Sequence, residues 1–241
     1  SVTVIDTRTD EIVETMSLRW HIGDLFGASP NALVFDAKGK NLYVCNGGQN
    51  AVAVVSFDPG KSKILGLIPT GWFPGAIAYD AERRAVYVAN IKGQGSGHPP
   101  AAGHKPEFNT HQFFGTLSLI PLAGKSELEN QTKIVLENFR REVVEQAMLP
   151  PRADAQPKPL PERSGEPSLI KHVIYIIKEN RTYDHVLGDM KEGYGDPDLC
   201  VFGEKVTPNQ HKLSREFVLL DNTCCSGVLS ADGHQWCDSA M

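Results

Sequence analysis

The chain has 241 residues, of which 41% are hydrophobic and 22% charged, and its formal net charge is −5. This is the composition of an ordinary globular protein with enough apolar residues to bury a core. Lysine and arginine are scattered along the sequence, which argues against binding to nucleic acid or to an acidic membrane surface. No apolar run reaches the length of a transmembrane helix. We therefore expect no nucleic-acid partner and no transmembrane segment.

The first half of the chain contains two similar segments spaced 44 residues apart. One ends in Tyr43-Val-Cys-Asn46 and the other in Tyr87-Val-Ala-Asn90, and each carries a proline and an aspartate at matching earlier positions. In each segment the pattern predicts an alternating strand, a polar turn and a second strand, followed by a further strand. The predicted strands are residues 32–35, 42–45 and 51–56 in the first unit, residues 76–79, 86–89 and 116–120 in the second, and residues 1–6 in an earlier unit.

A spacing of 44 residues is typical of the four-stranded blades of a β-propeller. The Tyr-Val-x-Asn ending resembles the YVTN repeat family of β-propellers. The resemblance implies a partial propeller of about three blades over residues 1–124, with Tyr43 and Tyr87 at equivalent places on the third strand of adjacent repeats. A closed propeller has about four to eight blades, so we expect further blades from outside this sequence. A propeller could also bind a partner protein.

Residues 125–167 are predicted to connect two domains. Ser126-Glu-Leu-Glu129 has the pattern of a capping box, and the spaced apolar residues after it predict a helix to about Met148. A run of prolines from Pro150 to Pro167 then predicts an extended, semi-rigid linker. Upstream, residues 91–114 form an insertion rich in Gly, Pro and His. Its histidines have no common metal-ligand spacing, so we assign no metal to His98, His104 and His111.

The sequence contains an odd number of cysteines, five, without the spacing of a zinc ribbon or a redox motif. We interpret them as buried or free thiols. Three lie close together near the end of the chain, which leaves open one disulfide in an exported protein, reaching back to Cys200.

The segment with the most chemical information begins the region 168–241. Residues 173–177 form an apolar, β-favouring run, which predicts a strand buried on both faces of a mostly parallel sheet. Glu179 and Asn180 follow at once, where open α/β sheets place their ligand crevice. Their carboxylate and amide oxygens suit a divalent cation, and histidines from elsewhere would shift the preference towards zinc. The alternative is that Glu179 caps a helix beginning near Arg181.

A second apolar run, residues 217–220, ends in Asp221 and Asn222 and leads to Ser230-Ala-Asp-Gly-His234. A serine hydroxyl beside a helix N-terminus and a cation ionises more readily and can attack phosphorus. The alternative role for Ser230 is that of a helix N-cap. That alternative explains the serine but not the run as a whole.

Both motifs resemble segments of one family. Glu179-Asn-Arg-Thr-Tyr-Asp-His185 resembles the opening motif of the phosphoesterases that include bacterial phospholipases C and acid phosphatases, in the alkaline-phosphatase-like superfamily. Ser230-Ala-Asp-Gly-His234 resembles the nucleophile segment of their propeller-fused members. The resemblance implies the first part of an α/β domain in residues 168–241, a periplasmic or extracellular protein, a divalent metal ion on Glu179 and Asn180, and a catalytic Ser230. The remaining motif residues would orient the ligands or contact the substrate: Arg181, Asp184, His185, Asp232 and His234.

The chain also departs from the family pattern. Residues 223–228 include two cysteines where aromatic and acidic residues usually stand, which puts substrate preference in question. The family's remaining Asp and His ligands are expected beyond Met241, so we expect the 241-residue chain to be inactive by itself. Two functions follow: a metal-dependent hydrolase of phosphate esters, or a non-catalytic propeller binding protein with a degenerate or incomplete phosphoesterase domain. Architecture does not separate them, because propellers host many unrelated functions.

Overall fold

The computed structural model describes residues 1–21, 24, 27–93, 114–122, 124–221, 223, 230, 233, 234 and 237. The chain divides into two units, the first built from Ser1–Gln94 and Gly115–Tyr175 and the second containing Ile176–Ala240. None of the helices within the described ranges is long and apolar enough to cross a membrane.

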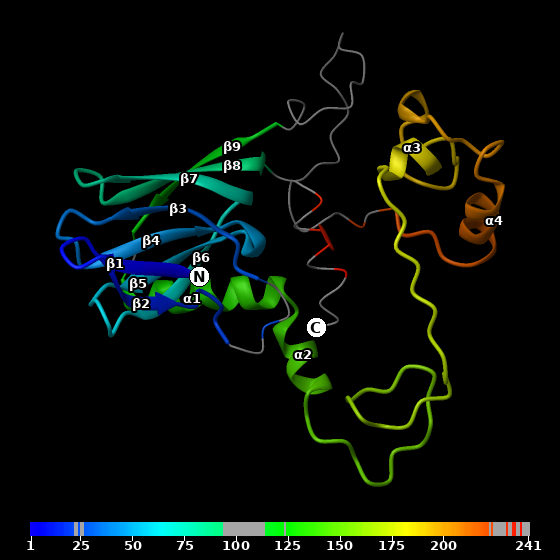
Figure 1. Cartoon of the computed structure of the whole chain (residues 1–241), viewed down its shortest axis with the longest axis horizontal. Coiled ribbons are helices and arrows are strands. Elements are labelled where there is room, and N and C mark those ends of the chain that lie inside the picture. The colour runs from blue at the N-terminus through cyan, green and yellow to red at the C-terminus, as the bar shows by residue number, and fades with distance from the viewer. Residues whose placement is uncertain are drawn as a thin grey trace. The chain divides into compact units, whose positions relative to one another are not determined.

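In its described residues, the first unit contains three antiparallel sheets in which consecutive strands are neighbours (Figure 1). The seven strands predicted within residues 1–124 all occur, which confirms a sheet-rich fold, and the structure adds two, β2 and β6. The strands are β1 (Val2–Asp6) and β2 (Glu11–Met16) in the first sheet, β3 (Pro30–Phe35), β4 (Asn41–Asn46), β5 (Ala51–Ser56) and β6 (Lys63–Pro69) in the second, and β7 (Trp72–Asp80), β8 (Ala85–Gly93) and β9 (Thr116–Pro121) in the third. The short helix η1 (Gly47–Gln49) follows β4.

The two sequence repeats have the same strand register. Tyr43 on β4 pairs with Val34 on β3, and Tyr87 on β8 pairs with Ala78 on β7. Val34 and Ala78 are also 44 positions apart, so the tyrosines occupy equivalent places, as predicted. The prediction of a third strand is wrong, because both tyrosines lie on the second strand of their sheet. The strands that precede β3 and β7 pair with the preceding sheet instead.

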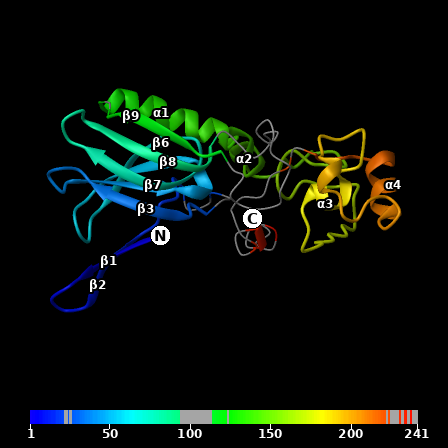
Figure 2. The ribbon, with the colours of Figure 1, turned by 90° about the horizontal axis from the view of Figure 1, so that it is seen from above.

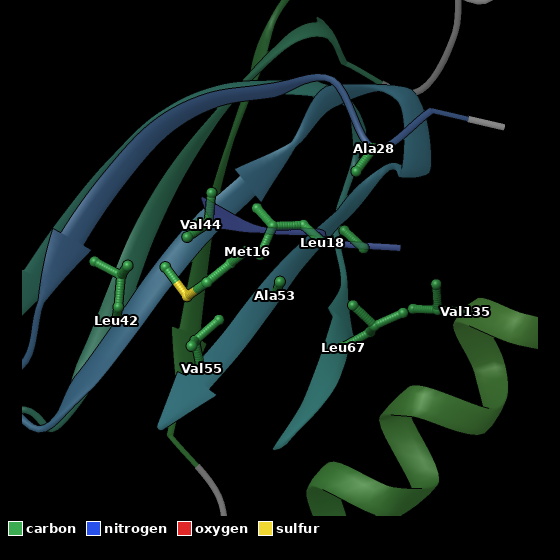
Figure 3. Close-up of a cluster of buried hydrophobic side chains, with 10 residues drawn as sticks. Met16, Leu18, Ala28, Leu42, Val44, Ala53, Val55, Leu67 and Val135 are labelled. Atoms are coloured by element: carbon green, nitrogen blue, oxygen red, sulfur yellow. The ribbon is translucent and has the colours of Figure 1, made fainter. Parts of the chain in front are cut away.

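One hydrophobic core covers one face of the four-stranded sheet (Figure 3). Side chains alternate along β4, so Leu42 and Val44 point to this face while Tyr43 and Cys45 point to the other. Met16 at the end of β2 and Leu67 on β6 complete the cluster with residues of β5. Each such aliphatic side chain stabilises the fold by about 1.5–3 kcal/mol when fully buried.

A second core fills the space between the four-stranded and the three-stranded sheet. Tyr43 and Cys45 pack there with Val86 and Val88 of β8. The rings of Tyr43 and Tyr79 are stacked with centroids 6.1 Å apart, and burial raises the pKa of Tyr43 to about 12. The four-stranded sheet is therefore covered on both faces. The three-stranded sheet lies above it in Figure 1 and overlaps it when seen from above in Figure 2.

The helix predicted to reach Met148 is two helices, α1 (Lys125–Asn138) and α2 (Arg141–Ala147). Arg140 has φ 53, a left-handed conformation that cannot continue an α-helix. The predicted capping box is also wrong, since α1 begins at Lys125 with Gly124 as N-cap and no side-chain cap. Ser126 already lies inside the first turn.

Helix α1 packs against β6, the edge strand of the four-stranded sheet. The Thr132 hydroxyl accepts a hydrogen bond from the Leu67 amide at 2.9 Å and donates to the Leu128 carbonyl at 2.7 Å. Gly66 permits this approach, because a Cβ atom there would lie 2.5 Å from Cγ of Leu128. The helix thus satisfies a backbone donor that the sheet leaves unpaired.

The proline-rich linker is a closed loop, not the extended spacer that its composition predicts. Glu166 is buried and accepts from Arg152 Nε at 2.7 Å, and this hydrogen bond lowers the pKa of Glu166 to about 2. Ser164 N donates to the Ala147 carbonyl at 2.8 Å, and Lys158 pairs with Ser168 in a β-bridge. Prolines fix local backbone angles, but these contacts between distant residues decide the path of the chain.

The predicted strand at residues 173–177 is absent. The segment has no regular structure, and Val173 and Ile174 are 83% and 87% exposed. A doubly buried parallel strand needs a neighbour on each side, and no described residue pairs with this segment. The same holds for residues 217–220, so the α/β sheet expected from residue 168 onward is not formed by the described residues. The second unit instead contains α3 (Tyr183–Leu187), η3 (Pro197–Leu199) and α4 (Pro208–Glu216).

A buried histidine anchors α4. His211 is fully buried, with Nε2 2.8 Å from a carboxylate oxygen of Asp189 and Nδ1 2.8 Å from the Thr207 carbonyl. A carboxylate and a carbonyl both only accept, so these two contacts favour the imidazolium form of His211, in which both ring nitrogens donate. Asp189 also accepts from the amide of Glu204 at 3.0 Å, which joins the turn before α4 to the same group.

Candidate functional site

The predicted metal ligand Glu179 contacts residues of the predicted nucleophile segment. Its carboxylate is 2.6 Å from Nε2 of His234, a residue 55 positions away in the sequence, and it also accepts a hydrogen bond from Ser230. The structure therefore brings together residues from two separate motifs, all within the second unit. The proximity agrees with the sequence prediction, while the chemical roles of the three side chains stay predictions.

The charges of this group are set by its hydrogen bonds. The His234 hydrogen bond, followed by that of Ser230, lowers the pKa of Glu179, so the carboxylate is ionised and can only accept. His234 and Ser230 must then both donate. The side chains of Glu179 and His234 are 42% and 44% exposed, so a solute can reach them.

Ser230 and His234 both interact with the carboxylate of Glu179. Both residues have helical backbone conformation. They place a hydroxyl and an imidazole beside the same carboxylate.

Arg181 contacts the backbone of Asn180 and the ring of Phe202. The Asn180 carbonyl accepts from the Arg181 guanidinium at 2.6 Å, and that guanidinium lies over the ring of Phe202, 5.0 Å from its centroid. Within the described part of the chain, no hydrogen bond joins the Asn180 side chain to Glu179, Ser230 or His234. Arg181 thus contacts the backbone directly after Glu179, and its role in the site stays a prediction.

The other motif residues fasten the loop that follows. Helix α3 begins at Tyr183, capped by Thr182, rather than near Arg181. Asp184 accepts from the Asp196 amide at 2.8 Å, and the His185 carbonyl accepts from the Phe202 amide at 2.8 Å. Asp184 therefore holds the loop at Asp196, and its role towards the ligands or the substrate stays a prediction.

Two contributions to this scaffold were missed by sequence reasoning. Asp221, which follows the second apolar run, accepts from the Tyr194 amide at 2.9 Å and so ties the end of that run to the loop after α3. Gly193 leaves room for Tyr183, since a Cβ atom there would lie 2.2 Å from the tyrosine hydroxyl. Neither residue belongs to a recognisable motif. Four residues near the end of the chain lie outside the described residues: Asn222, Cys224, Cys225 and Asp232. Most of the insertion at residues 91–114, with its three histidines, lies outside them as well. Of that insertion, the structure describes residues 91–93, which end β8, and residue 114.

The donor atoms around Glu179 fit a divalent cation. A carboxylate, an imidazole and a hydroxyl converge there, and these are ligand types that zinc and other divalent transition metals accept. Among the described residues no group of three or more His, Cys, Asp or Glu side chains surrounds a common point, so Glu179 and His234 form at most part of a ligand set. The three described cysteines, Cys45, Cys200 and Cys237, are free thiols.

Comparison with known proteins gives little further information. No protein-family model and no curated protein matches the chain. A solved structure, hydrazine synthase of Kuenenia stuttgartiensis, is similar over 37% of this chain and 22% of that chain, with 26% sequence identity and a TM-score of 0.30. The chain thus spans less than a quarter of that protein's length, and a similarity at this TM-score carries no argument about fold or function.

Proposed function

We propose that the protein is a metal-dependent hydrolase of phosphate esters in which Ser230 is the nucleophile. The observation that carries this proposal is the convergence of Ser230 and His234 on the ionised carboxylate of Glu179. Three residues that the phosphoesterase resemblance assigns to one site, from two separate motifs, are neighbours in space. A chance resemblance of two short motifs would not require that.

The chemistry follows from the hydrogen bonds. The Ser230 hydroxyl loses its proton to solvent and its oxygen attacks phosphorus, while the bond from phosphorus to the leaving oxygen breaks and the leaving group takes up a proton from solvent. Water then cleaves the phosphoserine, which restores the hydroxyl and releases the phosphate product. Glu179 fixes the direction of the Ser230 hydroxyl, and in-line alignment of that oxygen with the leaving group is what makes the attack fast. Bound by Glu179 with the adjacent Asn180, a divalent cation would stabilise negative charge on the serine and phosphate oxygens.

We further propose that the sheets of the first unit are blades of a β-propeller. Their consecutive-strand order, the equivalent register of the two repeats and the burial of both faces of the middle sheet support this. Such blades would restrict access to the second unit or recruit a partner protein. The proposed enzyme is periplasmic or extracellular, in line with the family it resembles.

The test is hydrolysis of an aryl phosphate monoester or diester by the full-length protein. Ser230→Ala should reduce the rate at least about a thousandfold, because the covalent intermediate cannot form. Thr223→Ala, which removes a hydroxyl a few residues upstream, is the matched control and should keep most of the activity. Glu179→Ala should also abolish hydrolysis, and added divalent metal should not restore it.

Two outcomes would contradict the proposal. Wild-type rates in Ser230→Ala would rule out the nucleophile. No hydrolysis by the wild-type protein with any divalent metal would favour the non-catalytic binding protein, in which the sheets are the working part.

A further inference from the structure

Nε2 of His234 lies 2.6 Å from Oε2 of Glu179, and this distance has a specific consequence for metal binding. Two ligand atoms bound to one divalent cation at about 2.0–2.2 Å each end up roughly 3 Å apart. A cation could therefore take the place of the hydrogen bond with a small outward movement of the two side chains. Their partial exposure leaves room for that movement.

We propose that His234 is a direct ligand of the cation, together with Glu179, and that this makes the site selective for zinc-like transition metals over magnesium and calcium. The inference rests on the proposed function, because it concerns the same site. Imidazole nitrogen is a common ligand of zinc, copper, iron and nickel, whereas magnesium and calcium bind almost only oxygen. The Ser230 hydroxyl hydrogen-bonds to the same Glu179 carboxylate. The candidate ligand atoms are therefore the imidazole nitrogen of His234, the carboxylate oxygens of Glu179 and the hydroxyl oxygen of Ser230.

The experiment is a titration of the purified, full-length protein with Co²⁺, followed by its visible absorption, with Zn²⁺ added in competition and Mg²⁺ titrated by calorimetry. The variants are His234→Ala, Glu179→Gln and the matched control His172→Ala, which removes an exposed histidine outside the site. Circular dichroism checks that each variant is folded. Because His234 is exposed, its replacement should not unfold the protein.

We expect wild-type protein and His172→Ala to give the same Co²⁺ spectrum and the same affinity. His234→Ala should weaken Co²⁺ and Zn²⁺ binding by at least about tenfold and change the spectrum, because a nitrogen ligand is lost. Mg²⁺ should bind more weakly than Co²⁺ in the wild type, and its affinity should be the same in His234→Ala.

Three results overturn the inference, and they differ in what else they affect. If His234→Ala keeps the wild-type affinity and spectrum while Glu179→Gln loses them, His234 is no ligand but the proposed metal site stands. If Mg²⁺ binds as tightly as Zn²⁺, the claimed selectivity alone is wrong. If the folded wild-type protein binds none of the three cations, the inference and the metal-dependent function both fail.

Discussion

At the scale of single residues, the ion pair between His211 and Asp189 makes the second unit sensitive to pH. Burial lowers the pKa of His211, but the Asp189 hydrogen bond and the Thr207 carbonyl outweigh burial, and the net direction is upward. The His211 hydrogen bond, followed by the Glu204 amide, lowers the pKa of Asp189 to about 2. The negative charge of Glu204 also raises the pKa of His211. Glu204 itself accepts a hydrogen bond from Arg215 Nη2 at 2.9 Å.

The sign of the pH effect follows from these shifts. A histidine whose pKa is raised by folding stabilises the folded state fully below about pH 6.5, and this contribution is lost as the pH rises through the folded value. Asp189 contributes above about pH 4, and its contribution is lost as the pH falls towards 2. We therefore expect protection of the α4 amides from hydrogen exchange, corrected for intrinsic rates, to decrease from pH 6 to pH 8.5.

Asp189→Asn tests the origin of that decrease. The variant should lose about 1–3 kcal/mol of local stability at pH 6 and most of the pH dependence, since a buried imidazolium loses its counter-charge. We place the loss in the lower part of that range because Asp189 is 34% exposed. Asn209→Ala, an exposed change on the same helix, is the control. An unchanged pH dependence in Asp189→Asn would show that another group causes it.

Only those residues of the candidate site that stand in short sequence motifs could be predicted from the sequence. Glu179 and Ser230 each stand in a short run whose residue types suggest chemistry, and the sequence identified both. His211 and Asp189 stand in no motif, and their importance comes from burial and pairing across the fold. The sequence pattern cannot reveal the contact between His211 and Asp189, because that contact depends on how two segments 22 residues apart meet in the fold.

At the scale of elements, the strands of the two repeats were predicted correctly, whereas the strand predicted at residues 173–177 does not form. Strands β3, β4, β7 and β8 recur with one spacing, and each has a partner nearby in the sequence, so a hairpin satisfies its backbone. Residues 173–177 have the same β-favouring composition but no adjacent partner among the described residues. β-propensity describes how well a residue fits a sheet that exists, and it does not create the neighbouring strand.

The contact between α1 and β6 gives a prediction at this scale. Thr132→Val keeps the shape of the side chain but removes the oxygen that accepts from the Leu67 amide, a donor in a fully buried residue. We expect a loss of about 1–3 kcal/mol in the free energy of unfolding of the first unit, the cost of one buried donor without a partner. Urea titration followed by circular dichroism measures it.

A neighbouring substitution provides the comparison for Thr132→Val. Asn130→Ala changes an exposed position of α1 and should be neutral or slightly stabilising, because alanine favours helix. Equal stability of Thr132→Val and Asn130→Ala would mean that the hydroxyl adds nothing to the packing of α1 on β6.

At the scale of the whole molecule, the buried residues are unequally distributed. All members of the two hydrophobic cores lie between Val2 and Phe139. In the described part of the second unit, the buried residues are Gly188, Met190 and His211. Several of its large apolar side chains are exposed instead, including Tyr194, Phe217 and Val218, each 73% exposed. Hydrophobic burial is the main stabilising term in folding, so the two units should differ strongly in stability.

We therefore predict that a polypeptide of residues 1–149 folds without the second unit. It contains both cores and both helices, α1 and α2. Its thermal midpoint should lie within about 5 °C of the main transition of the whole chain, a shift that corresponds to roughly 1–2 kcal/mol. A polypeptide of residues 168–241 should show no cooperative transition, because it buries too little apolar surface to offset its conformational entropy. Calorimetry of the two pieces and of the whole chain makes the comparison. A non-cooperative 1–149 piece would mean that the sheets depend on residues after 149, and a cooperative 168–241 piece would mean that the second unit has a core of its own.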